Sequence, residues 1–235
     1  MPPKPLPTPR AFLTSLFTTL ASTPAPLPPP PDQPSVFPGN PLQGLGDDAR
    51  GLLSTLHVLF PSQLLPALDL LDRRLVTRVI VRDVPARRPA TARTDSSRED
   101  GVVEDDGEGD GRKGTYIVRS LASTMRRKAE SKCYLVLLTA WSCTCPAFVF
   151  DAFPPASLSV PVVAGTPDDG PAADGEAWSF GGLSLDGLPG ASGNVPCCKH
   201  LLACVLVEKW GAVLGKYALE RRVTKEEMAG LVAEI

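Results

Sequence analysis

The chain has 235 residues, so it has room for one or two domains. Its 26 prolines and 20 glycines make up about a fifth of the residues, more than ordinary globular chains contain, which predicts one small folded domain with long disordered insertions. Every apolar run is shorter than the roughly 18 residues that a membrane-spanning helix needs, so no span is expected.

The formal charge of −2 is unevenly distributed. Residues 95–110 hold eight acidic groups and one arginine, and residues 151–196 hold six acidic groups with no lysine or arginine. The rest of the chain, which contains the segments expected to fold, is therefore basic, with a formal charge of +11. This bias permits an anionic partner such as DNA, although exposed lysines and arginines are also ordinary surface residues.

Several segments show helical periodicity or helix-start signals. Apolar residues recur at helical spacing in residues 10–22, and again between Asp47 and Pro61. Thr224 and Glu227 have the spacing of a capping box, which predicts a final helix. We expect helices at 10–22, 47–60, from Leu64 to near Arg73, from His200 to about Trp210, and from Thr224 onward.

Residues 75–82 are rich in β-branched residues and predict a strand, and we expect two more strands at residues 115–121 and 133–141. Because they follow one another, we expect a three-stranded antiparallel sheet in an α+β domain, with packed helices before and after it. Trp178 and Phe180 interrupt the Gly-, Pro- and Asp-rich second insertion, and we expect them to attach it to the domain.

Two close pairs of potential metal ligands lie around the second insertion. Cys143 and Cys145 form the first pair, and Cys198 and His200 form the second, with 52 residues between Cys145 and Cys198. Three thiolates and one imidazole are a common ligand set for a closed, tetrahedral zinc site. We therefore predict one structural Zn²⁺ held by these four residues, with no open position for water or substrate.

Cysteines can also serve purposes other than metal binding. Cysteine is often a small buried apolar residue, and we assign that role to Cys133 and Cys204. A disulfide framework is not favoured, because the chain shows no secretory signal. Cys197 is an alternative ligand to Cys198, since Cys197-x-x-His200 is also sterically feasible; His57 lies off the apolar stripe and is assigned no ligand role.

The ligand spacing C-x-C-x52-C-x-H resembles the SWIM zinc finger. The short motifs around the ligands, CTCPAF at 143–148 and CKHLLA at 198–203, resemble those of the small SWIM-domain subunit of the Shu complex. The segment ALDLLDR at 67–73 is also similar to that family. The resemblance covers roughly residues 10–22, 47–82, 114–150 and 197–235, and the long insertion within the finger departs from the family's shorter spacing.

The resemblance implies a non-enzymatic adaptor of homologous recombination in the nucleus. Such a protein pairs with a RecA-fold recombinase paralog and promotes assembly or stability of recombinase filaments, with single-stranded DNA reached through the complex. No general base, nucleophile pair or phosphate loop is apparent in the sequence, and no small-molecule substrate is expected. Direct DNA binding by the finger is the alternative, as is an accessory role in another nuclear complex; few aromatic residues are left for stacking on bases.

The chain is accordingly divided into five parts. These are a Pro-rich N-terminal region with a short amphipathic helix (1–46), a helical pair with the first strand (47–82), a disordered acidic insertion (83–113), a SWIM zinc-finger domain with a disordered insertion at 151–196 (114–210), and a C-terminal helical segment (211–235).

Overall fold

The computed structural model describes residues 6–24, 42, 44–82, 114–120, 132–153, 178–184 and 195–235. The acidic insertion at 83–113 lies outside these residues, as does most of the second insertion. Residues 151–153, 178–184 and 195–196 are the described parts of the second insertion.

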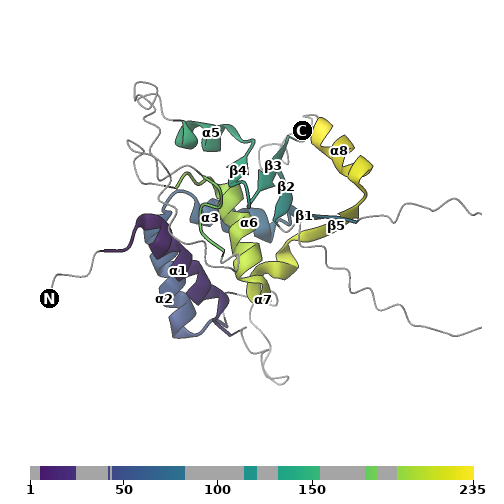
Figure 1. Ribbon diagram of the computed structural model, residues 1–235. Coiled ribbons are helices and arrows are strands. Elements are labelled where there is room, and N and C mark those ends of the chain that lie inside the picture. Colours follow the sequence, from purple (N-terminus) through teal and green to yellow (C-terminus); the bar gives the residue numbers. More distant parts are fainter. Residues whose placement is uncertain are drawn as a thin grey trace, which may run out of the picture.

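The described residues form an α+β fold around one mixed sheet of five strands, in the order β4-β3-β2-β1-β5 (Figure 1). The prediction of three strands is therefore wrong in number, whereas the three predicted strands pair antiparallel as expected. The pairs β1–β2, β2–β3 and β3–β4 are antiparallel, but β5 pairs parallel to β1. The strands are β1 (Val76–Val81), β2 (Thr115–Arg119), β3 (Cys133–Leu137), β4 (Ser142–Cys143) and β5 (Leu219–Val223).

The two additional strands carry weak sequence signals for physical reasons. β5 has the sequence Leu-Glu-Arg-Arg-Val and only its last residue is buried, so it lacks the alternation of apolar and polar residues that marks a half-buried strand. β4 contains two residues and follows a turn at 138–141. That turn divides the single long strand expected at 133–141 into β3 and β4.

The helices expected from the periodicity are present. They are α1 (Pro9–Ala21), α2 (Asp47–Leu59), α3 (Leu64–Asp72), α6 (Lys199–Lys209) and α8 (Lys225–Ala233). The structure adds two short helices, α5 (Pro146–Ala152) and α7 (Gly211–Leu214), and the 3₁₀ turn η3 (Gly215–Tyr217). The N-cap of α2 is Gly46, and Asp47 and Asp48 lie in its first turn. The capping box of α8, formed by Thr224 and Glu227, is confirmed.

Helix α6 is the centre of the core. Every residue from His200 to Val207 is buried, so the helix is covered on all sides rather than along one stripe. It packs against α3 and α1 and also contacts β3 and β4 (Figure 1). The element that carries half of the expected metal ligands is therefore also the element around which the domain packs.

Residues 178–184 pack onto the domain, which confirms the expectation for Trp178 and Phe180. The Phe180 ring is fully buried; it stacks on Phe17 of α1 with ring centroids 5.3 Å apart and meets Trp141 edge-on at 4.5 Å. Arg10 donates hydrogen bonds to the carbonyl oxygens of Gly182, at 2.8 Å, and of Ser184, at 3.0 Å. This segment therefore joins α1 to the turn that precedes the first cysteine pair.

Gly182 is required where this segment touches the turn. Its φ of +47° lies in the left-handed region, and a Cβ atom there would lie 2.5 Å from the carbonyl oxygen of Thr139. The adjacent residue, Leu183, donates its N–H to the same oxygen at 3.0 Å. A side chain at position 182 would therefore push the segment away from the domain.

The C-terminal helix differs from the expectation of packed helices after the sheet, because α8 has no buried residue. In the described part of the chain no single helix has the length and hydropathy to span a bilayer. Helices α2 and α3 meet that criterion only when taken together, and the chain bends by 119° between them.

Candidate metal centre

The four predicted ligands come from three elements that meet at one end of the sheet. Cys143 is the last residue of β4, Cys145 is the N-cap residue of α5, Cys198 is the N-cap residue of α6, and His200 lies in the first turn of α6. All four are buried. The structure thus brings together every residue that the sequence predicted for the site.

Two distances between these side chains are close to those of a tetrahedral site. The ligand atoms of the four residues all lie within 4.8 Å of one another. The Nδ1 atom of His200 is 3.8 Å from the Sγ atom of Cys143 and 3.9 Å from that of Cys198. Zinc–sulfur bonds of about 2.3 Å place two tetrahedral ligand atoms about 3.5 to 3.8 Å apart. The group therefore has the geometry to hold one metal ion.

Two of the sulfur atoms also cap helices, in equivalent ways. The Sγ atom of Cys145 accepts the backbone N–H of Phe148 at 3.4 Å, and that of Cys198 accepts the N–H of Leu201 at 3.5 Å. Each donor is three residues after its cysteine, which is the hydrogen bond that an N-cap side chain makes. A thiolate is a better acceptor than a thiol, so both helix starts favour the metal-binding form of the side chain.

Hydrogen bonds among the thiols shift the pKa values of Cys143 and Cys145 in opposite directions. Hydrogen bonds from the thiols of Cys143 and Cys198 lower the pKa of Cys145 well below its ordinary value. The pKa of Cys143 is raised by its hydrogen bonds with Cys145 and Cys198, and also by burial of its thiol. Zinc binds cysteine as the thiolate, so metal binding must release the protons that these thiols carry.

A hydrogen bond next to the ligands fixes the two pairs relative to each other. The indole N–H of Trp141 donates to the carbonyl oxygen of Pro196 at 2.7 Å. Trp141 precedes the first ligand by two residues, and Pro196 precedes Cys198 by two residues. Trp141 has a φ of +47°, a left-handed conformation that is uncommon for a bulky residue and indicates a constrained turn.

The loop between the first two ligands is fixed as well. Thr144 lies between the two cysteines and makes two hydrogen bonds with Leu135 of β3. Its backbone N–H donates to the Leu135 carbonyl at 3.1 Å, and its Oγ1 accepts the Leu135 N–H at 3.0 Å. The sheet therefore determines where the sulfur atoms of Cys143 and Cys145 lie.

The remaining cysteines and the second histidine lie outside the ligand group. Cys197 is buried, but its backbone N–H donates to Asp151 at 2.7 Å and its thiol is directed to the carbonyl oxygen of Cys198 at 3.7 Å. Cys204 is buried in α6, as expected, whereas Cys133 is only half-buried. His57 is exposed on α2.

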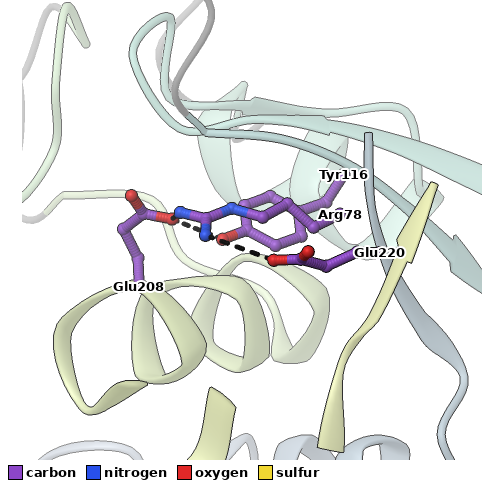
Figure 2. A network of polar contacts seen from close by, with 4 residues as sticks. All are labelled: Arg78, Tyr116, Glu208 and Glu220. Atoms are coloured by element: carbon purple, nitrogen blue, oxygen red, sulfur yellow. Dashed lines mark hydrogen bonds and ion pairs between the residues drawn. The ribbon is translucent and has the colours of Figure 1, made fainter. Parts of the chain in front are cut away.

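The opposite end of α6 is held to the sheet by a polar network that the sequence did not indicate. The carboxylate of Glu208 accepts hydrogen bonds from the Arg78 guanidinium of β1 and the Tyr116 hydroxyl of β2, both at 2.5 Å (Figure 2). Arg78 also lies 4.0 Å from the carboxylate of Glu220 on β5. Burial and the neighbouring Glu208 carboxylate raise the pKa of Tyr116 well above its usual range, so Tyr116 remains a donor.

Comparisons of the chain with protein-family models, with curated proteins and with solved structures found no match. Support for the site therefore comes from the sequence motif and from the geometry of the residues.

Proposed function

We propose that Cys143, Cys145, Cys198 and His200 bind one Zn²⁺ as a structural site of the SWIM type. The observation that carries this proposal is the convergence of the four ligand atoms within 4.8 Å from elements 57 residues apart in sequence. Three thiolates and an imidazole suit zinc, because soft sulfur ligands favour it over calcium or magnesium. Four protein ligands complete the shell, so the ion stabilises the fold and performs no catalysis.

On this zinc-held domain we propose an adaptor function in homologous recombination in the nucleus, with a RecA-fold recombinase paralog as the partner. The short sequence motifs around the ligands support this proposal, because they resemble those of the small SWIM-domain subunit of the Shu complex. DNA is then reached through the assembled complex.

Exposed phenylalanine side chains in and just after the helix that begins at Cys145 support a protein-binding role. A groove of about 200 Å³ lies between α1, the α2–α3 junction, α5 and the start of α6. Its lining residues are Pro9, Phe12, Leu13, Leu59, Phe60, Gln63, Asp151, Val195 and Cys197. The side chains of Phe150 in α5 and Phe153 after it are 73% and 72% exposed, which is unusual for phenylalanine and typical of residues that meet a partner.

The proposal is tested by affinity purification from the native host with wild type, His200→Ala and His57→Ala. His57→Ala is the matched control, because it removes the exposed histidine of α2. We expect a RecA-fold paralog to co-purify with wild type and His57→Ala and to be lost with His200→Ala. If no such partner appears and the purified chain alone binds DNA in a salt-sensitive way, the direct DNA-binding function replaces the adaptor.

A second pair of variants separates the exposed phenylalanines from the metal. Phe153→Asp places a charge at the exposed ring that follows α5, and Leu183→Asp places the same charge at another exposed apolar position, which is 74% exposed. Both variants should retain zinc, since neither residue belongs to the ligand group. We expect only Phe153→Asp to lose the partner; equal binding by both would show that the partner uses another surface.

A further inference from the structure

Strand β5 is an edge of the sheet with one open side. It is the last strand in the order, and its only neighbour among the described strands is β1. Its side chains are exposed except that of Val223. An edge strand offers unpaired N–H and C=O groups along that side and is therefore able to pair with another strand.

One hydrogen bond fixes which residues of β5 have their backbone groups directed outward. The carbonyl oxygen of Val223 accepts the N–H of Arg82 at 2.8 Å, so the backbone groups of Val223 face β1. The direction alternates along a strand, hence the N–H and C=O groups of Glu220 and Arg222 face the open side. These two residues are the ones whose backbone would bond to an added strand.

We propose that this edge binds a second copy of the chain, by antiparallel pairing of β5 with β5 about a two-fold axis at Arg221. In this register Glu220 of each copy lies opposite Arg222 of the other copy, and the two residues exchange backbone hydrogen bonds. Opposite-charge pairs placed directly across an antiparallel ladder stabilise it. The same operation puts Leu219 opposite Val223 of the second copy and doubles the five-stranded sheet.

The charge order of β5 selects this register over its neighbours. The register between the two strands can shift only in steps of two residues if Glu220 and Arg222 are to keep their backbone hydrogen bonds. A shift of one residue would place backbone groups that face β1 opposite the second copy. A two-fold axis at Glu220 would put Glu220 opposite itself, and an axis at Arg222 would put Arg222 opposite itself. Only the axis at Arg221 gives two ion pairs, at the expense of one contact between like charges at Arg221.

The side chains that the pairing needs are accessible. Arg221 and Arg222 are exposed. The Glu220 side chain lies 4.0 Å from Arg78 of β1 (Figure 2) and is still 55% exposed, so it remains accessible to a second cation. A short strand interface of this kind is small, so the dimer should be weak, with a dissociation constant on the order of 10–100 µM.

The test measures the mass of the zinc-loaded full chain by sedimentation equilibrium over a concentration series up to about 500 µM, well above this expected constant. Wild type should dimerise, and more weakly as salt increases, because the pairs are exposed. Glu220→Arg and Arg222→Glu should each raise the dissociation constant about tenfold or more, since attraction becomes repulsion at two places. The matched control is Arg50→Glu in α2, which makes the same charge change as Arg222→Glu at a position away from β5.

Mixing the two reversed chains gives the decisive result. Glu220→Arg presents two arginines and Arg222→Glu presents two glutamates at positions 220 and 222, so an equal mixture should recover the wild-type affinity that each reversal alone weakens. Arg221→Thr should tighten the wild-type dimer, because it removes the repulsion at the axis. A wild type that stays monomeric overturns the proposal, and would indicate that the charges protect the edge from pairing. The proposal is also overturned if the charge reversals leave the dimer unchanged, or if the mixture stays monomeric.

Discussion

The Sγ atom of Cys143 lies 3.8 Å from the Nδ1 atom of His200, although the two residues are 57 positions apart in sequence. β4 places the cysteine and the first turn of α6 places the histidine. The second insertion joins these two elements, so an ion shared by them would close a long loop. Loop-closure entropy grows only logarithmically with length, which means that the length of this loop adds little to the free-energy cost of the site.

Removal of the histidine should abolish metal binding. We expect His200→Ala to lower zinc content from about one ion per chain to near zero after dialysis against a chelator that leaves wild type loaded. Thermal unfolding of the dialysed variant should match that of wild type stripped by acid and chelator. His57→Ala should keep both the ion and the wild-type melting temperature. Full zinc content in His200→Ala would remove His200 from the site.

The two adjacent cysteines should behave differently. Cys198→Ala should lose zinc, because its sulfur lies in the ligand group. Cys197→Ala should keep zinc, and should lower the free energy of unfolding by only about 1 kcal/mol, as expected for a small buried side chain. Metal analysis and urea unfolding of the two purified variants check this prediction. The opposite pattern of zinc loss would show that Cys197 is the ligand.

Phe180 should contribute strongly to stability although it lies within a glycine-rich segment. Phe180→Ala should lower the free energy of unfolding by about 3 to 5 kcal/mol, because it removes a fully buried ring from contact with Phe17, Phe60 and Trp141. The control is Leu183→Ala in the same segment, at an exposed position, with an expected change within about 0.5 kcal/mol. Equal effects in urea unfolding would mean that the segment does not pack as described.

Alkaline pH should weaken the fold through Tyr116. Burial and then the Glu208 carboxylate raise its pKa in the folded state above the ordinary value of about 10, so the folded state holds the proton more tightly than the unfolded chain does. The stability contributed by Tyr116 is therefore complete below pH 10 and is lost progressively above it.

Replacement of the hydroxyl isolates this effect. Tyr116→Phe should lower the free energy of unfolding by about 1 to 3 kcal/mol at pH 7, since the partly buried Glu208 carboxylate loses one donor. Above pH 10 the difference between wild type and variant should shrink, because all other titrating groups are common to both. Urea unfolding from pH 7 to 11 measures this difference; a constant difference would contradict the assignment of the titration to Tyr116.

The sequence was sufficient to predict the ligand group because its signal is local. Two pairs of close ligands limit how the chain can fold around an ion, and the structure brings Cys143, Cys145, Cys198 and His200 together as expected. The helices α1, α2 and α3 were predictable for a similar reason, because each buries apolar residues at helical spacing. Thr224 and Glu227 form the expected capping box through contacts three residues apart.

The features that sequence reasoning missed depend on contacts between distant residues. β5 carries exposed charged side chains, and its strand conformation comes from parallel pairing with β1, about 140 residues earlier in the chain. Glu208 appears as an ordinary charged residue at the end of a helix, and its role follows only from the approach of Arg78 and Tyr116 from the sheet. The helix α5 is difficult to predict because Pro146 suits the end of a strand as well as the first turn of a helix.

Binding of a single zinc ion by three sulfur atoms and one nitrogen atom underlies the function proposed for this protein, and X-ray absorption at the zinc edge of the purified chain tests it. We expect about one zinc per chain, with three sulfur ligands near 2.3 Å and one nitrogen ligand near 2.0 Å. A shell of four sulfur atoms would bring Cys197 or another cysteine into the site in place of His200. An oxygen-rich shell, or a purified chain without zinc, would contradict the proposed site and the function built on it.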